Sequence, residues 1–174
     1  MDTCTTKLYN IGLWTIARLP ENISKKLPSR GMVMVEGRIN GVYFQTPLEP
    51  DGKGSHWFRV DDVLLKKINA KAGDTIDLKL GPIDDWPDPK IPKDVDRIFN
   101  TLSIKQHWDS ITPNAKWEWI RWIQSTGNKA TREKRINLAI AKLAKGEKRP
   151  CCFNRNMCCV PGVSKSGVLM DSSS

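Results

Sequence analysis

The sequence predicts an α+β protein, with a small N-terminal β-barrel followed by a C-terminal helical domain. Residues 1–81 contain about six short runs of β-branched and aromatic residues separated by turn sequences, a pattern typical of a small barrel. Residues 82–92 hold four prolines and read as an extended linker. Residues 93–174 carry apolar side chains at helical spacing and end in a cysteine-rich tail, so we assign them to the helical domain.

The barrel region begins with strand-like stretches separated by clear turn signals. Residues 13–17 read as a strand that Pro20 stops, and residues 32–39 read as another. Asn40-Gly41 then predicts a tight hairpin, because both central positions of a type I′ turn need positive φ. We expect the chain to return antiparallel from Val42.

The second half of the barrel region contains a glycine-rich loop over residues 50–55. This loop includes Gly-Lys-Gly-Ser but lacks the spacing of a P-loop, so we predict a hairpin tip and keep phosphate binding as the alternative. Residues 56–60 and 75–80 read as strands. Between them, residues 61–68 read as a short helix, with acidic residues first and lysines last.

The helical region predicts three helices. The first starts near residue 93, where Val95, Ile98, Phe99 and Leu102 recur at helical spacing. Thr112-Pro113 predicts the start of the second helix, since Thr can cap it and Pro suits the first turn. The third helix ends before Gly146, which suits a left-handed cap. Its apolar face consists of Ile136, Ala139, Ile140 and Leu143. The last two helices should form an antiparallel hairpin.

Several short motifs in this half carry a resemblance to a known family. They read W-x-x-I-T-P, I-R-W-I, T-R-E-K-R-I and G-E-K-R-P-C-C-F along the chain. These motifs resemble the YdeI/OmpD-associated family, which is named for a reported link to protection against bacteriocins. The N-terminal region is similar to the uncharacterised small β-barrel domain that often precedes this module. The resemblance implies a double-split barrel, similar in plan to the AbrB-type DNA-binding fold, and it implies no catalytic residues.

The basic charge of the chain is concentrated in its C-terminal part. Of a net charge of +9, residues 105–174 contribute +8, with 13 basic and 5 acidic residues. A solvated basic surface would explain this excess. An anionic ligand or nucleic acid is the alternative explanation. Because the lysines surround the last helix instead of lining one stripe, we expect weak, nonspecific binding to nucleic acid at most.

Four residues of the helical hairpin are candidates for binding a ligand or partner: Trp117, Arg121, Arg132 and Arg135. Arg132 lies on the apolar face of its helix and needs an acceptor, which Glu118 or Asp109 could provide. A bound anion is the alternative acceptor. Trp117 falls on a polar face beside Arg121, as in a binding hot spot or a base-stacking platform. A neighbouring segment, such as the cysteine-rich tail, could instead cover it.

The tail contains four of the five cysteines: Cys151, Cys152, Cys158 and Cys159. Four thiols so close together could bind zinc or carry out redox chemistry. However, the paired C-x₂-C spacing of zinc ribbons is missing, and adjacent side chains in an extended segment point to opposite faces. We therefore predict ordinary thiols, no bound metal and no cofactor, and keep a thiol redox or metal-binding protein as an alternative.

The remaining signals favour a cytoplasmic protein that is not an enzyme. The first residues lack the pattern of a signal peptide, and no apolar run approaches the ~20 residues of a membrane helix, so we expect no membrane insertion. The two histidines, His56 and His107, do not assemble a recognisable catalytic group. We predict a non-enzymatic protein of the YdeI/OmpD-associated type with a part in stress or bacteriocin protection. Nucleic-acid binding through the basic half is the main alternative.

Overall fold

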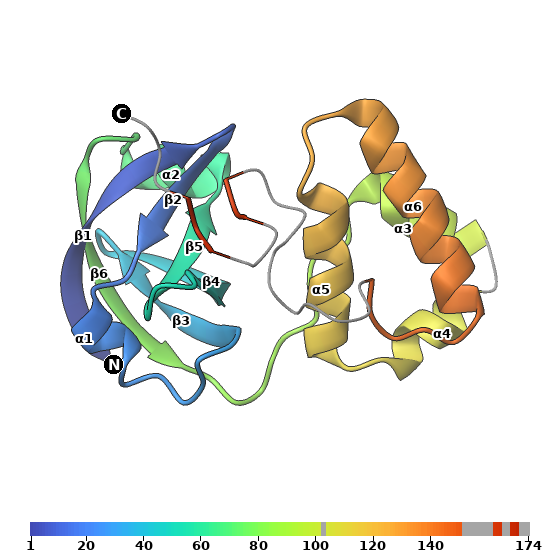
Figure 1. Cartoon of the computed structure of the whole chain (residues 1–174), viewed down its shortest axis with the longest axis horizontal. Helices are drawn as coiled ribbons and strands as arrows, with labels where there is room; N and C mark the ends of the chain where they lie inside the picture. Colours follow the sequence, from blue (N-terminus) through green and yellow to red (C-terminus); the bar gives the residue numbers. More distant parts are fainter. Residues whose placement is uncertain (102–103, 151–161, 165–167, 171–174) are drawn as a thin grey trace. The chain divides into compact units, whose positions relative to one another are not determined.

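The computed structural model describes residues 1–101, 104–150, 162–164 and 168–170, which fall into two compact units (Figure 1). The barrel unit consists of Met1–Asp84 together with the described residues after 161. The helical unit runs from Asp85 to residue 150 within the described residues. From the sequence, we had assigned the whole tail to the helical domain. The structure instead groups its described part with the barrel.

The barrel unit is a closed six-stranded antiparallel barrel, which confirms the predicted small barrel and the α+β class. Around the barrel the strands follow the order β1-β2-β5-β4-β3-β6. The strands are β1 (Asp2–Ile11), β2 (Trp14–Arg18), β3 (Val33–Ile39), β4 (Val42–Pro50), β5 (His56–Val60) and β6 (Thr75–Pro82). Two short helices, α1 (Glu21–Ser24) and α2 (Asp62–Ile68), lie between strands in the chain.

Side chains point alternately into and out of the barrel along each strand, and those that point inward are mainly apolar. The predicted hairpin joins β3 to β4, where Asn40 and Gly41 have φ of 46° and 84°. Gly37 on β3 has no room for a side chain, since a Cβ there would lie 1.9 Å from the backbone oxygen of Lys79 on β6. The interior cluster includes Leu8, Ala17, Val35, Leu48, Phe58 and Leu80. Because the sheet closes on itself, it has no open edge to protect.

Within its described residues, the helical unit contains four helices, where the sequence predicted three. They are α3 (Lys93–Thr101), α4 (Lys105–Ser110), α5 (Pro113–Gln124) and α6 (Lys129–Ala144). The additional helix, α4, is short and buries Trp108, between the buried residues Ile104 and Ile111. This i, i+4, i+7 spacing is a helical signal that we did not use. Leu102, which we had assigned to the first helix, lies outside the described residues.

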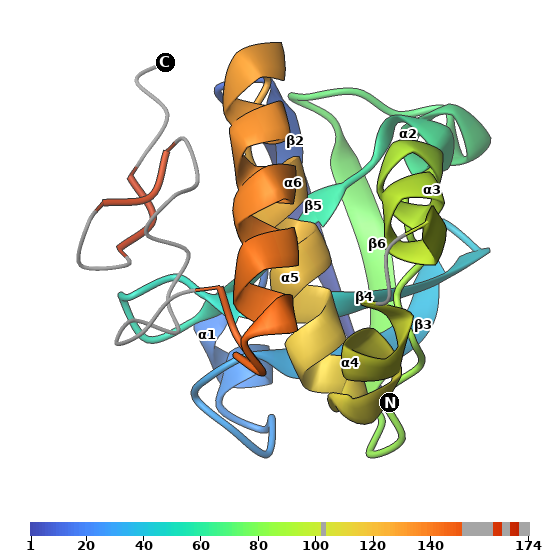
Figure 2. The ribbon, with the colours of Figure 1, turned by 90° about the vertical axis from the view of Figure 1, so that its right-hand side faces the viewer.

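The predicted antiparallel hairpin of α5 and α6 is confirmed, and Figure 2 shows the two helices side by side. The Thr112 hydroxyl accepts a hydrogen bond from the Ala115 amide, and Pro113 occupies the first turn. Asn128 caps α6 in the same way through the Thr131 amide. Gly146 follows α6 with φ of 82°. Within the described residues, no helix has the length and apolar character needed to cross a membrane.

The proline-rich segment between the two units makes contacts with both of them. Its first residues continue the barrel, since β6 ends at Pro82 and the Ile83 amide donates to the Met34 carbonyl at 3.0 Å. Its later residues belong to the helical unit, where Pro87 and Asp88 contact α5. Sequence composition predicted an extended, proline-rich linker over 82–92. In the structure both ends of this segment make specific contacts.

Candidate functional site

Arg132, the first candidate residue, joins α6 to α3 through a carboxylate. Its Nε lies 3.1 Å from Asp94 Oδ2, and its Nη2 lies 3.0 Å from Asp94 Oδ1. These hydrogen bonds hold the pKa of the Asp94 carboxyl below its usual range. The expected carboxylate partner is therefore present, but the suggested partners Glu118 and Asp109 were wrong. Sequence periodicity could not select Asp94, because the choice depends on how α3 crosses α6.

Arg135, one turn further along α6, closes the C-terminal end of α5. Its Nη1 donates to the Trp122 carbonyl at 2.7 Å and also to the Ser125 hydroxyl. The guanidinium carbon lies 5.4 Å from the centre of the Trp122 ring, in a cation–π arrangement. A cation at this position also interacts favourably with the negative end of the helix dipole. Like Arg132, Arg135 links α6 to a neighbouring helix.

Trp117 and Arg121 lie on α5, and both are partly buried. The indole Nε1 of Trp117 donates to the Pro87 carbonyl at 2.7 Å. The segment preceding α3 therefore provides the polar partner of Trp117, where we had suggested the cysteine-rich tail. The hydrogen bonds of Trp117, Arg132 and Arg135 lead to three different places, namely Pro87, Asp94 and the end of α5.

Two charged side chains of α5 are buried, and the sequence analysis predicted neither of their ion pairs. Lys116 Nζ lies 2.8 Å from Asp88 Oδ2. Glu118 accepts a hydrogen bond from Arg149, which follows α6 and also contacts Asn114. Both Lys116 and Glu118 are 7% exposed. A helical wheel could have revealed them, because they border the apolar stripe of α5.

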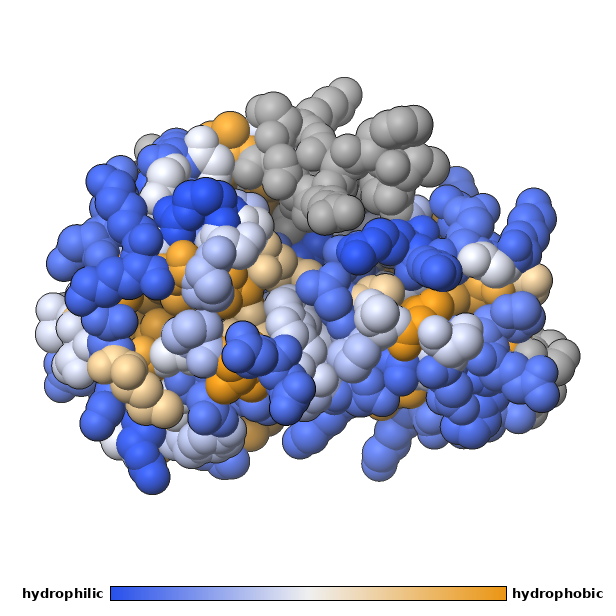
Figure 3. Space-filling model, turned by 90° about the horizontal axis from the view of Figure 1, so that it is seen from below, coloured by the Kyte–Doolittle hydropathy of each residue, from blue (hydrophilic) through white to orange (hydrophobic). Residues whose placement is uncertain are grey.

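On α6 and just after it, the exposed positive charge comes from lysines. Lys129, Lys134, Lys145 and Lys148 are all exposed on or just after α6. Lys142 is partly buried and contacts Glu147 at 3.1 Å and the Pro150 carbonyl at 3.2 Å. On the face drawn in Figure 3, hydrophilic residues predominate and apolar residues form small patches. A lysine surface of this kind attracts anions without fixing their geometry.

Comparison with protein families covers both units. The family described as a domain of unknown function, DUF1905, matches residues 6–80. The family described as Bacteriocin-protection, YdeI or OmpD-Associated matches residues 88–146. The chain is a DUF1905 domain followed by a YdeI or OmpD-associated domain. This finding confirms the resemblance carried by the sequence motifs. No curated protein matches the chain.

The YdeI or OmpD-associated domain corresponds to the helices α3–α6, and all four candidate residues fall inside it. Arg149 lies just beyond the matched residues, although it makes the pair with Glu118. The DUF1905 domain covers the barrel from β1 to β6. Neither family description assigns a reaction, so the chemistry of the residues must decide between a binding protein and an enzyme.

The DUF1905 domain contains a buried serine–histidine pair. Ser24 Oγ lies 2.7 Å from His56 Nδ1, and His56 Nε2 lies 2.8 Å from the Gly31 carbonyl. Since a carbonyl only accepts, Nε2 carries the proton and Nδ1 accepts from Ser24. Burial lowers the pKa of His56 and so favours the neutral ring. Both side chains are buried, and the pair joins α1, the start of β5 and the segment before β3.

The glycine-rich loop between β4 and β5 is organised around its own carboxylate. Asp51 Oδ1 accepts hydrogen bonds from the Lys53 and Ser55 amides at 2.7 and 2.8 Å, and Oδ2 accepts from Arg18 Nε at 2.7 Å. Burial by itself would raise the pKa of Asp51, but these hydrogen bonds hold it below the usual value. The amides that could cradle a phosphate already bind Asp51. The predicted hairpin tip is confirmed, and the phosphate alternative is not supported.

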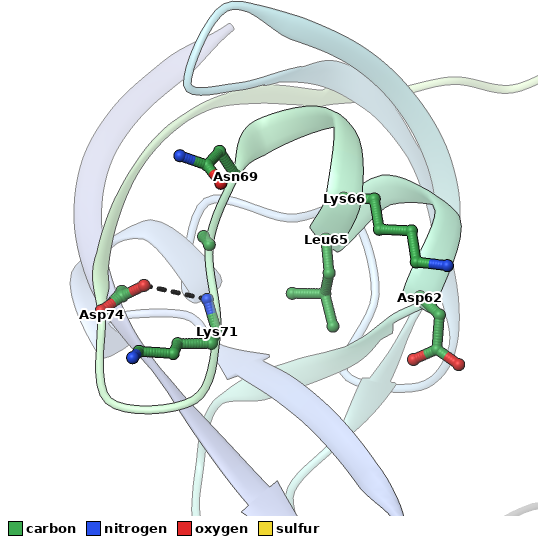
Figure 4. A pocket seen from close by; sticks show the side chains of 7 residues that line it. Asp62, Leu65, Lys66, Asn69, Lys71 and Asp74 are labelled. Carbon is green, nitrogen blue, oxygen red and sulfur yellow. Dashed lines mark hydrogen bonds between the residues drawn. The ribbon is translucent and has the colours of Figure 1, made fainter.

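A shallow pocket lies beside α2 of the DUF1905 domain (Figure 4). The Lys71 amide donates to Asp74 Oδ2 at 2.9 Å within it. Its lining residues are Asp62, Leu65, Lys66, Asn69, Ala70, Lys71 and Asp74. Two lysines and two aspartates give this pocket no dominant charge, and it presents little apolar surface for a ligand.

The described residues contain no group of three or more histidine, cysteine or acidic side chains placed to hold a metal ion. Cys151, Cys152, Cys158 and Cys159 lie outside the described residues, so the expectation of ordinary tail thiols stays a prediction. Cys4 on β1 is a half-buried free thiol, and burial raises its pKa. A thiol with a raised pKa is a poor nucleophile at neutral pH.

Proposed function

We propose that this chain is a binding protein, not an enzyme, and that it contributes to protection against bacteriocins or related stress. In this proposal the YdeI or OmpD-associated domain presents its lysine surface to an anionic partner. The description of the family supports the biological role. The charge of the C-terminal part supports the chemistry of the partner.

The observation that carries the proposal is the difference between the arginines and the lysines of α6. Arg132 and Arg135 bind Asp94 and the end of α5, so their fork-shaped guanidinium groups serve the fold. The lysines Lys129, Lys134 and Lys145 are exposed to solvent. Lysines act as mobile point charges, which suits a broad anionic surface better than one planar ligand. The binding surface is therefore expected to be extended and salt-sensitive.

The contacts of the polar groups support a binding protein over an enzyme. Ser24 and His56 are both buried and face each other and Gly31. Asp51 is saturated by Arg18 and by two backbone amides. A catalytic group must reach its substrate within hydrogen-bonding distance, and none of these side chains is placed to do so.

The test is a survival experiment with two matched charge-reversal variants. Bacteria that express the chain, or an empty vector, are exposed to a panel of bacteriocins. The test variant changes Lys129, Lys134, Lys145 and Lys148 to Glu, and the control variant changes the exposed barrel residues Lys7, Lys66, Lys67 and Lys79 to Glu. We expect the test variant to fall to the survival of the empty vector and the control variant to protect like the wild type. Equal protection by both variants would reject the proposed lysine surface.

Weak binding to nucleic acid is the second candidate function. The net charge of +8 on residues 105–174 supports it, and so would the AbrB-like plan expected for the barrel, which stays a prediction. Arg132 and Arg135, near the start of α6, bind Asp94 and the Trp122 carbonyl. This argues against sequence-specific contacts between these arginines and the bases of a nucleic acid. We expect sequence-independent binding with Kd of ~10⁻⁴–10⁻⁶ M at physiological salt. Titration of random-sequence and genomic fragments at two salt concentrations tests this, and tight binding to one sequence that survives raised salt would contradict it.

A further inference from the structure

The outer surface of the DUF1905 barrel carries an apolar face formed by β1, β2 and β5. Side chains alternate along each strand, and directly opposed residues in antiparallel pairs share a side of the sheet. Ala17 and Phe58 are opposed and point into the barrel. Their neighbours Ile16 and Trp57 must therefore point outward. Even so, Ile16 is 0% and Trp57 1% exposed.

The C-terminal tail packs on this outer face. Val163 and Leu169 form one apolar cluster with Ile11, Ile16 and Trp57, which is separate from the barrel interior. Tyr9 and Trp14 pack against the same cluster from its margin. Figure 1 draws the two described pieces of the tail, in red, beside β5. We call these outward residues of β1, β2 and β5 the outer apolar face.

The two described tail segments, residues 162–164 and 168–170, pair with each other through hydrogen bonds. Val163 and Leu169 form an antiparallel bridge, which places their side chains next to each other. The Met170 amide donates to the Gly162 carbonyl at 2.7 Å, and the Ser164 amide donates to the Val168 carbonyl at 2.8 Å. Two neighbouring aliphatic side chains therefore enter the outer apolar face together.

Two further contacts fix the position of these paired segments on the barrel. The Leu169 amide donates to the backbone oxygen of Asp51 at 2.9 Å, and the carboxylate of Asp51 is itself held by Arg18. Gly162 rests directly on Ile11, because a Cβ at this glycine would lie 1.7 Å from Ile11 Cγ2. Gly162 also has φ of 84°, a conformation that favours glycine. The fit is therefore specific in backbone as well as in side chains.

We propose that the outer apolar face is a peptide-binding site and that the paired tail segments 162–164 and 168–170 are its resident ligand. The ligand that fits has two short antiparallel segments, with two aliphatic side chains opposite each other and a glycine against Ile11. Because the tail belongs to the same chain, it occupies the site at an effective concentration on the order of mM. A free peptide of the same chemistry therefore gains access when the tail is undocked. This site lies on the barrel, so the test of this proposal does not depend on the lysine surface of the helical unit.

The test uses the full chain, labelled with 5-fluorotryptophan, and a synthetic peptide of residues 160–171. In ¹⁹F NMR, the Trp57 signal is assigned with Trp57→Phe. Leu169→Asp places a charge in the apolar cluster and should shift the Trp57 signal, whereas Met170→Asp, at an exposed neighbouring position, should not. Gly162→Val is a second variant that should release the tail from the barrel. It alters no residue of the barrel strands and replaces Leu169→Asp in the experiment if that variant does not fold.

Addition of the native peptide should return the Trp57 signal of the undocked chain to its wild-type position. The same peptide should leave the wild-type chain unchanged, because its site is filled. A peptide with Gly162→Ala should bind at least about tenfold more weakly, since an L-residue with this φ is strained. The proposal fails if Leu169→Asp leaves the Trp57 signal in place, if millimolar native peptide has no effect on the undocked chain, or if the alanine peptide binds equally well.

Discussion

The barrel and the helical unit bury polar groups in different ways. In the barrel, the buried residues Ser55, His56 and Asp51 bind mainly backbone amides and carbonyls, and Arg18 adds one charge pair. In the helical unit, the buried residues Lys116 and Glu118 bind charged side chains instead. These partners come from segments before α3 and after α6, not from the neighbouring helices.

The difference follows from the way in which the core of each unit is enclosed. Every strand of the barrel has a neighbour on both sides, so the backbone ladder completes the sheet. In the described part of the helical unit, the segments that flank the helices contribute to enclosing the core. Pro87 accepts from Trp117, and the Lys148 carbonyl accepts from the Trp119 indole at 3.0 Å. The segments next to the helices are therefore parts of the helical unit.

Arg149→Ala should give the largest effect. It leaves the buried Glu118 carboxylate without its guanidinium partner, which costs about 3–5 kcal/mol for a fully buried pair. Because Arg149 is about one-third exposed, we expect a smaller loss of about 2–3 kcal/mol. Hydrogen exchange of the α5 amides, read by mass spectrometry, measures the free energy of opening of this unit.

The matched control for Arg149→Ala is Lys148→Ala. Lys148 is exposed, and its contact with Trp119 uses the backbone carbonyl, which alanine retains. The barrel amides should keep their protection in both variants. If Arg149→Ala and Lys148→Ala have the same effect on α5, the Glu118–Arg149 pair does not stabilise the helical unit.

The stability of the barrel should depend on pH through His56. Its pKa is lowered in the folded state, chiefly by burial, so the unfolded chain binds a proton more readily. Stability is then complete above the ordinary value of 6.5 and falls as the pH drops below it, by at most about 1.4 kcal/mol per unit. Urea unfolding between pH 7.5 and 5.5 measures this slope. His56→Gln should reduce the dependence of the unfolding free energy on pH, and the control His107→Gln should not. An unchanged slope in His56→Gln would contradict the assignment of this pH dependence to His56.

Asp88→Asn tests the contact between the proline-rich segment and α5. The change removes the counter-charge of Lys116, whose side chain is buried, but Asp88 itself is mostly exposed. Water can therefore compensate in part, and we expect a loss of about 1 kcal/mol. Asp85→Asn, in the same acidic stretch, is the control. Equal protection of the α5 amides in both variants would show that the Asp88–Lys116 pair does not stabilise the helical unit.

Arg132→Ala should have the smallest effect, although the sequence placed this arginine on an apolar face. Its partner Asp94 is about half exposed, so we expect a loss of about 0.5–1 kcal/mol. The lowered pKa of Asp94 means that this contribution is present above the ordinary carboxyl value of 3.8 and is lost as the pH falls through the folded value. Thermal unfolding at pH 7 and pH 3 checks both points. A drop of several kcal/mol at pH 7 would restore the buried-charge interpretation.

Rules that depend only on neighbouring residues were sufficient to predict much of the fold. The turn at Asn40-Gly41, the cap at Thr112 and the glycine after α6 each depend on a few adjacent residues, and all three are present as expected. The alternation of strands and the apolar face of α6 likewise follow from the sequence. These features are set by local sterics and periodicity, which a single sequence contains.

The contacts between distant residues could not be predicted in the same way. Asp94 pairs with a residue 38 positions away, and Glu118 pairs with Arg149 across 31 positions. A charge pattern shows that a partner is needed but not which one is near. The docking of Leu169 on Trp57 was hidden for the same reason, since the tail has no periodicity that points to the barrel.

The most direct measurement of the difference between the two units is a double-mutant cycle on Glu118 and Arg149. The variants Glu118→Ala, Arg149→Ala and the double variant are compared through the opening free energy of the α5 amides. If a charge pair closes the helical unit, the two changes are coupled by about 1–3 kcal/mol, and the barrel amides are unaffected. Additive effects, with a coupling near zero, would contradict this conclusion.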